Sequence, residues 1–127
     1  FLFRVAEAYL NAAEAEMHIN GEGSAKAKGY IDALRNRAHA AVRASYTLSD
    51  VLDERARELY CEGLRRTDLI RFNQFGGSQA TYNWELKGGS TNGTTFTKTY
   101  NVYPLPSSEV LSNKNLTQID GYNEVQN

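Results

Sequence analysis

The chain has 127 residues, of which 41% are hydrophobic, and this length and composition are typical of one folded domain. Its 14 basic and 15 acidic side chains leave a net charge of −1, so no broad electrostatic attraction to nucleic acid or to anionic lipid is expected. No segment reaches the roughly 20 consecutive apolar residues that a transmembrane helix needs.

The single cysteine and the two histidines indicate no metal or redox site. Cys61 has no partner for a disulfide within the chain, and we expect a buried free thiol because cysteine packs as a small hydrophobic residue. His18 and His39 have no second type of ligand at a familiar metal-binding spacing. The sequence therefore predicts neither a metal site nor a cofactor.

The first part of the chain has the periodicity of two antiparallel helices. Residues 1–20 and 25–41 carry small or apolar side chains at helical spacing, and Gly21 and Ser24 mark the break between them. Gly29, which costs up to ~1 kcal/mol relative to alanine in a helix, is expected where the two helices touch closely. The positions expected to face inward are Leu2, Val5, Ala6, Tyr9, Ala13, Met17, Ala27, Tyr30, Ile31, Leu34 and Ala38.

A second helix pair is predicted at residues 48–62 and 67–75. Thr47 and Asp50 have the spacing of a capping box, and Gly63 stands where the first of these two helices is expected to end. Opposite charges three or four residues apart predict ion pairs that tie this helix to the corner that follows it. These pairs are Asp53 or Glu54 with Arg57, and Glu62 with Arg66.

The same charged helix also permits an enzymatic interpretation. Glu54, Glu58 and Glu62 are spaced one helical turn apart, and paired carboxylates carry out glycoside hydrolysis. We expect structural ion pairs instead, because arginines stand at the spacings that pair with these carboxylates. No catalytic residue is therefore predicted.

The character of the sequence changes after the second helix pair. The run GGSQATYNWELKGGSTNGTTFTKT (76–99) is rich in Gly, Ser, Thr and Asn and has no helical period, which predicts long loops that could include a short β-hairpin. Tyr100, Val102 and Tyr103 then form an extended run that we expect in the core, and Pro104 keeps this run out of a helix.

Together these signals predict a mainly α fold in one domain, residues 1–127. Tetratricopeptide-like antiparallel helix pairs occupy residues 1–75, and a loop-rich, partly extended segment occupies residues 76–127. Because stacked repeats cover the apolar faces of their neighbours, one such helix pair cannot bury its own apolar face.

Three blocks of the sequence, in this order, resemble the SusD/RagB family. The blocks are FRVAEAYLNAAEA (3–15), LDERARELYCEGLRRTDLIRF (52–72), and YPLPSSEV followed by NKNLTQIDGY (103–122). Members of that family are glycan-binding lipoproteins of the bacterial outer membrane. The resemblance implies that this chain is the C-terminal portion of such a protein, with the upstream part of the same protein as its partner.

The resemblance also implies a function and a location. The protein would bind an oligosaccharide or polysaccharide at the cell surface and pass it to a SusC-like TonB-dependent transporter of the outer membrane, for nutrient uptake. A lipid on an N-terminal cysteine, upstream of this chain, would anchor it. The alternative is a helical-repeat module that binds another protein and no glycan.

Tyr82, Asn83 and Trp84 are the residues best suited to contact a sugar. Aromatic faces stack on sugar rings and amides bond hydroxyl groups, and Trp84 is the only tryptophan. Glycine-rich stretches on both sides allow the backbone to approach a ligand closely. The alternative, which we favour from sequence, is that Trp84 packs the loop onto the helices, since the resemblance implies that the main sugar platform lies upstream.

Overall fold

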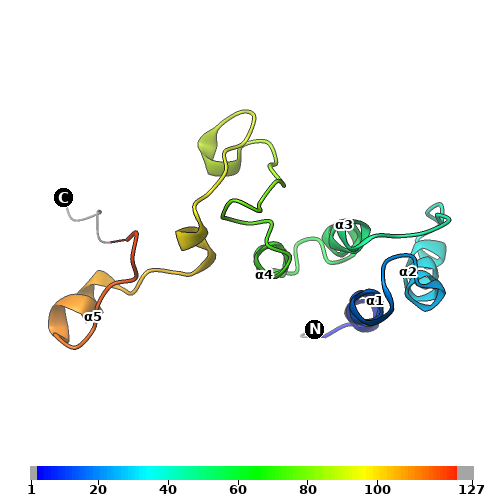
Figure 1. Ribbon diagram of the computed structural model, residues 1–127, viewed down its shortest axis with the longest axis horizontal. Helices are drawn as coiled ribbons and strands as arrows, with labels where there is room; N and C mark the ends of the chain where they lie inside the picture. The colour runs from blue at the N-terminus through cyan, green and yellow to red at the C-terminus, as the bar shows by residue number, and fades with distance from the viewer. Residues whose placement is uncertain (1–2, 123–127) are drawn as a thin grey trace. The chain divides into compact units, whose positions relative to one another are not determined.

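The computed structural model describes residues 3–122 and divides into two compact units, residues 1–68 and 69–127, which we describe one at a time (Figure 1). Residues 3–122 form five α-helices and no β-strand, as expected for a mainly α fold. None of these described helices combines the length and the apolar composition needed to cross a bilayer. Leu2, predicted to face inward, lies outside the described residues.

The first unit is built from three helices and the start of a fourth. In the first unit α1 lies against both α2 and α3 (Figure 1). The packing of α1 against α2 agrees with the first predicted helix pair, whereas α3 packs against α1. The helices are α1 (Val5–Asn20), α2 (Ala25–Arg37), α3 (Leu48–Glu58) and α4 (Arg65–Arg71).

The predicted caps of these helices are confirmed. The Asp50 backbone N–H donates to Thr47 Oγ1 (3.2 Å), and the Thr47 N–H donates to Asp50 Oδ2 (2.9 Å), which completes a capping box at the start of α3. Ser24 Oγ accepts a hydrogen bond from the Ala27 N–H at the start of α2. Gly21 ends α1 with φ of 87°, a conformation that glycine adopts readily.

The core of the first unit is formed by a stripe of α1 that differs from the predicted one. Leu10 is fully buried, although the sequence did not single it out, whereas Val5 is 73% exposed. Since residues four and seven apart share a helix face, the buried stripe runs through Ala6, Leu10, Ala13 and Met17. The packed cluster of buried residues consists of Ala6, Leu10, Leu34 and Leu59, with Leu64 against it.

The predicted ends of α2, α3 and α4 were wrong. Helix α2 ends at Arg37 instead of residue 41, because His39 adopts φ of 53° and the Arg35 guanidinium bonds the Ala41 carbonyl (Nε–O 2.7 Å). This early end leaves Ala38, predicted to face inward, exposed.

Helix α3 likewise ends at Glu58 instead of residue 62. The Glu58 carbonyl accepts a hydrogen bond from Arg4 Nη2 (2.6 Å), so an arginine of a distant segment satisfies an acceptor at the helix end. The chain then turns through Cys61 at φ of 63°. The next helix, α4, begins two residues before the predicted start and ends at Arg71, four residues before the predicted end.

Two predictions about small residues were also wrong. The Cys61 thiol is exposed instead of buried, because its residue lies in the turn after α3 and not on the buried face of a helix. Gly29 has no neighbouring atom within 4 Å of the position that a Cβ would take, so it does not mark a close contact between α1 and α2.

Helix α3 is tied to the corner that follows it, but through Arg55, Asp68 and Arg65 and not through the pairs predicted from sequence. Arg55 Nε lies 2.9 Å from Asp68 Oδ2, and both side chains are about 95% buried, at 4% and 5% exposure. Arg55 Nη1 also donates to Asn11 Oδ1 of α1 (2.6 Å), while Arg65 Nη1 donates to the Leu52 carbonyl (2.9 Å). One guanidinium thus connects α1, α3 and α4.

Tyr46 fixes the connection between α2 and α3. Its side chain is buried, its hydroxyl donates to Asp32 Oδ1 (2.8 Å), and the Arg43 N–H donates to that hydroxyl (3.0 Å). Lys28 forms an ion pair with the other oxygen of Asp32. Burial alone would raise the pKa of the Asp32 carboxyl, but the hydrogen bonds from Lys28 and Tyr46, together with the positive charges of Lys28 and Arg35, hold this pKa below its ordinary value.

This lowered pKa predicts a pH dependence of stability. Because the pKa of Asp32 is lower in the folded state, its contribution is complete above the unfolded pKa of about 3.9 and is lost as pH falls through the folded value. We expect the free energy of unfolding, measured in urea, to decrease between about pH 5 and pH 2. Asp32→Asn should lower stability at pH 7 and flatten this decrease, while equal slopes in the two proteins would contradict the role of Asp32.

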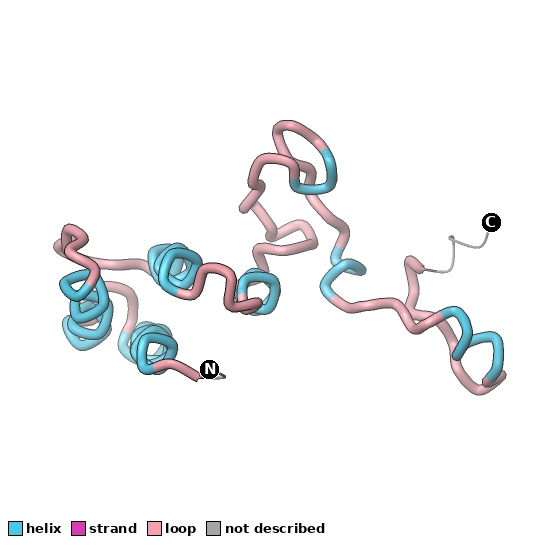
Figure 2. The backbone as a smooth tube through the Cα atoms, turned by 180° about the vertical axis from the view of Figure 1, so that it is seen from behind, coloured by secondary structure: helices cyan, strands magenta, loops and turns pink. Residues whose placement is uncertain are grey.

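The second unit is mostly loop (Figure 2). The end of α4 leads into a chain that touches itself through one isolated bridge between Gly76 and Phe96, where the Gly77 N–H donates to the Phe96 carbonyl (2.9 Å). Because this bridge is parallel, it is not part of a hairpin, and the described part of this unit contains no β-hairpin. The remaining elements are 3-10 turns at Lys87–Gly89 and Lys98–Asn101 and helix α5 (Ser107–Ser112).

The expectation that Tyr100, Val102 and Tyr103 lie in the core is wrong for this structure. These side chains are 51%, 48% and 72% exposed, and Tyr100 belongs to a 3-10 turn. Apolar alternation predicts burial only where a strand partner or a packed layer covers one face, and the described residues contain no strand.

Candidate functional site

Tyr82, Asn83 and Trp84 lie together on the surface of the second unit. The rings of Tyr82 and Trp84 have centroids 6.2 Å apart and planes inclined by 46°. Tyr82 is 38% exposed and Trp84 is 36% exposed, so each ring has one part packed and another part open to solvent. The three residues predicted from sequence as sugar contacts therefore form one continuous patch, which we call the aromatic loop surface.

A glutamine that follows α4 shapes the backbone of this loop. Gln74 Oε1 accepts hydrogen bonds from the backbone N–H groups of Thr81 (3.1 Å) and Tyr82 (3.0 Å), and from Thr81 Oγ1 (3.2 Å). Its Nε2 donates to the Gln79 carbonyl (3.4 Å). These bonds satisfy backbone groups that a loop outside regular secondary structure cannot pair with a neighbouring strand.

Gly93 allows the part of the chain that follows the loop to approach the Trp84 backbone closely. A Cβ at Gly93 would lie 2.4 Å from the Trp84 carbonyl oxygen, and the residue has φ of 74°, so a side chain there is excluded on two grounds. Asn83 Nδ2 lies at hydrogen-bond distance from Thr95 Oγ1 (3.5 Å). The backbone at Gly93 thus lies directly against the backbone at Trp84.

The buried side chain of Lys87 contacts this loop, and it was not selected from sequence. Its Nζ donates to the Tyr82 carbonyl and to Asn83 Oδ1, each at 3.2 Å. The same atom lies 4.8 Å from the ring centroid of Trp84 and 5.1 Å from that of Phe96. Burial lowers the pKa of this ammonium group.

Neighbouring rings extend from the loop as a series. Consecutive centroids lie 5.3 to 6.4 Å apart, the range of favourable aromatic contacts. The half-buried Phe75 and Phe96 form the middle of the series, which places its exposed members at the surface on a packed base. The members, in order of contact, are Tyr82, Trp84, Phe75, Phe96, Tyr100 and Tyr122.

The aromatic loop surface has the chemistry that an uncharged sugar needs. The open part of an indole or phenol ring can cover the apolar face of a pyranose, and an adjacent amide bonds its hydroxyl groups. Neither an ion pair nor a carboxylate takes part in the contacts of Tyr82, Asn83 and Trp84 given above. This arrangement suits the binding of an uncharged sugar.

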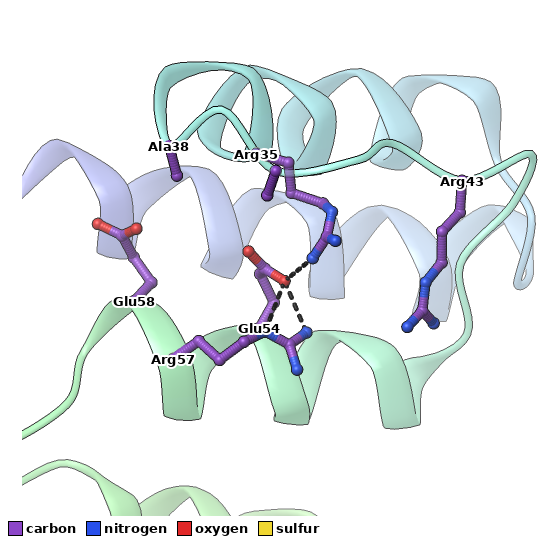
Figure 3. Close-up of a pocket in the computed structure, with 7 residues that line it drawn as sticks. Arg35, Ala38, Arg43, Glu54, Arg57 and Glu58 are labelled. Atoms are coloured by element: carbon purple, nitrogen blue, oxygen red, sulfur yellow. Dashed lines mark hydrogen bonds and ion pairs between the residues drawn. The ribbon is translucent and has the colours of Figure 1, made fainter.

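The second location with candidate chemistry is a charged pocket of the first unit, with a volume of about 310 Å³ (Figure 3). Glu54 Oε2 accepts hydrogen bonds from Arg35 Nη1 (2.6 Å) and Arg57 Nη2 (2.7 Å), so the predicted pair with Arg57 is confirmed. Glu58 pairs with Arg4 (3.0 Å), as does Glu62 (2.7 Å), a partner that sequence did not predict. Since each carboxylate already pairs with a guanidinium, the cluster has the features of a structural ion-pair network.

No group of three or more potential metal ligands occurs within residues 3–122. The aromatic loop surface and the charged pocket are two places among the described residues with recognisable side-chain chemistry. Of these, the first contains the residues selected from sequence.

Comparison with known proteins assigns the chain to a family. A sequence model of the SusD family matches residues 1–122. The curated starch-binding protein SusD of Bacteroides thetaiotaomicron is 44% identical over 122 residues, which make up 95% of this chain and 21% of that protein. The chain thus spans about a fifth of the length of that relative.

Solved structures give the same assignment. The surface glycan-binding protein A from Bacteroides uniformis matches with a TM-score of 0.74 and 32% identity, over 91% of this chain and 26% of that one. A SusD superfamily protein from Parabacteroides distasonis also matches with a TM-score of 0.74, at 25% identity over 94% of this chain and 26% of that one. These matches confirm the tetratricopeptide-like helical fold and the resemblance carried by the three sequence blocks, and the chain belongs to the SusD family.

Proposed function

We propose that this chain is part of a surface protein that binds an oligosaccharide and delivers it to a TonB-dependent transporter of the bacterial outer membrane. The protein has no catalytic role in this proposal. The observation that carries the proposal is the aromatic loop surface, with Tyr82 and Trp84 partly open beside the Asn83 amide. Support comes from the family and from two relatives named as a starch-binding and a surface glycan-binding protein.

The domain organisation and the anchoring belong to the same proposal. We infer that residues 1–127 form the C-terminal part of a single helical-repeat domain, since the chain covers 21% to 26% of the relatives compared with it and its three sequence blocks resemble the C-terminal portion of the family. The upstream part of that domain would then cover the exposed apolar side chains of α1, such as Val5 and Ile19 at 73% and 77% exposure. A lipid on an upstream N-terminal cysteine would hold the protein at the outer membrane, next to a SusC-like transporter.

The exposed side chains of α1 also favour a second candidate function. Apolar residues on a helical-repeat face commonly bind another protein. In that case the chain is a protein-interaction module and needs no sugar. The two candidates differ in which residues matter, because the first depends on the second unit's loop and the other on α1.

Replacement of Trp84 tests the first candidate. Removing an indole that stacks on a sugar ring should weaken binding roughly ten- to hundred-fold, since each factor of ten corresponds to about 1.4 kcal/mol. We expect this loss for Trp84→Ala when maltoheptaose is titrated into the chain by calorimetry, with cellohexaose as a second ligand. Maltoheptaose is the first choice because the curated relative is named as a starch-binding protein.

Tyr103→Ala is the matched control, because Tyr103 is an aromatic residue of the same unit and is 72% exposed. It should leave the affinity unchanged. An equal loss of affinity in both variants would show that the loss is not specific to Trp84, and would contradict a glycan contact at the aromatic loop surface. An unchanged affinity in Trp84→Ala would place the sugar contact elsewhere in the chain, whereas a native chain that binds neither glycan would leave the α1 face as the candidate to pursue.

A further inference from the structure

Lys87 is the most completely buried charged side chain of the described residues, at 1% exposure. An ammonium group that loses its water costs several kcal/mol unless polar groups replace that water. In the described part of the chain the replacement is two oxygen atoms and two aromatic ring faces, and no carboxylate pairs with the ammonium. Because burial of this ammonium group costs free energy, a role that offsets this cost is expected.

The atoms that surround the ammonium belong largely to the aromatic loop surface. Its two hydrogen bonds end on the Tyr82 carbonyl and on Asn83 Oδ1, and one of its two ring contacts is with Trp84. Its other ring contact is with Phe96, which belongs to the packed base of the aromatic series. One side chain therefore touches all three residues that were selected as sugar contacts, from the inner side.

We propose that Lys87 is a positioning residue that holds Tyr82, Asn83 and Trp84 in their binding arrangement before a ligand arrives. This inference rests on the proposed function, because the arrangement matters only if the loop contacts a glycan. A loop that is already ordered loses less conformational entropy when it binds, so its affinity is higher. The expected contribution of Lys87 is therefore to affinity, in addition to any contribution to folding.

The ammonium also determines which end of the Asn83 amide faces outward. An ammonium group only donates hydrogen bonds, so the amide oxygen must point to Lys87 and the NH2 group must point away from it. One N–H of that group lies near Thr95 Oγ1 (3.5 Å), which leaves the other for a ligand oxygen. Lys87 thus selects a hydrogen-bond donor at the surface next to the Trp84 ring.

The experiment compares Lys87→Met with the native chain. Methionine keeps an unbranched apolar stem and removes the ammonium. The control is Lys114→Met, which removes an exposed lysine of the same unit. Trp84 is the only tryptophan of the 127 residues, so fluorescence quenching by acrylamide reports on this loop alone.

Two measurements are made at a temperature where all three proteins are folded. Without ligand, we expect Trp84 in Lys87→Met to be quenched more strongly and to emit at longer wavelength, because the indole is released from its inner contacts. With maltoheptaose, we expect the affinity of Lys87→Met to fall about tenfold while its melting temperature remains above the temperature of the titration. Lys114→Met should match the native chain in both measurements.

The outcomes separate the positioning role from the proposed function. Native quenching and native affinity in Lys87→Met would overturn the positioning role. Stronger quenching with unchanged affinity would also overturn it, because the loop would be released without any effect on binding. If the native chain itself binds neither maltoheptaose nor cellohexaose, the proposed function fails for these glycans, whereas the quenching result still decides whether Lys87 holds the loop.

A measurement on the native chain keeps the inference testable if Lys87→Met does not fold. Ring currents of Trp84 and Phe96 should shift the ε-methylene protons of Lys87 upfield of those of Lys114 in NMR spectra. Coincident shifts for the two lysines would contradict the position of the ammonium between the rings, and with it the inference.

Discussion

Asp68→Ala is expected to lower the free energy of unfolding by about 3–5 kcal/mol, because it leaves the Arg55 guanidinium buried without its carboxylate. Both side chains of this ion pair are about 95% buried, so water cannot replace the lost partner. Arg55 also bonds Asn11 of α1, and the loss of its orientation should therefore loosen more than one helix contact. Urea denaturation of the chain, followed by circular dichroism, measures the change.

Two further variants show whether the buried charge is the cause. Asp53→Ala removes a half-buried carboxylate from the same helix, α3, and should change stability by less than about 1 kcal/mol. The double replacement Arg55→Met with Asp68→Leu removes both charges and should recover a large part of the loss. A double variant as unstable as Asp68→Ala would show that the hydrogen bonds of Arg55, and not its unpaired charge, carry the effect.

Leu10→Ala is expected to cost about 2–5 kcal/mol, the range for a fully buried leucine whose cavity collapses only in part. Leu10 is packed in the cluster that joins α1 to Leu34 of α2 and to Leu59 after α3. Ile19→Ala is the matched control on the same helix, since Ile19 is 77% exposed and should lose less than about 0.5 kcal/mol. Similar losses in the two variants would place the core of the first unit elsewhere.

Sequence predicted what depends on neighbouring residues and missed what depends on distant ones. The capping box of Thr47 and Asp50 is complete within four residues, and its prediction was confirmed. The end of α3 depends on Arg4, which lies 54 residues away from Glu58 in the sequence. No pattern among neighbouring residues could therefore predict where this helix ends. The glycine at position 63 is in the left-handed conformation as expected, but in the turn beyond the helix and not at its end.

In the candidate site, too, sequence indicated what depends on local composition and missed what depends on three-dimensional contacts. The composition of the loop was enough to select Tyr82, Asn83 and Trp84 as candidates, because aromatic rings stack on sugar rings and amides bond hydroxyl groups. The supporting residues Gln74 and Lys87 have no local signature, since a polar side chain reveals its partners only in three dimensions. A lysine among aromatic residues was the one signal in the sequence that could have pointed to the buried ammonium.

The glutamine after α4 has a consequence for how this loop can change over evolutionary time. The backbone amides of Thr81 and Tyr82 are held by a side chain that is not part of the exposed patch. Mutations that alter the outward rings therefore leave the main-chain path intact, whereas mutations at Gln74 alter the path itself. In the proposed function, selection for a new glycan would act on the outward positions while the loop keeps its shape, so that recognition would diversify without the loss of a folded scaffold.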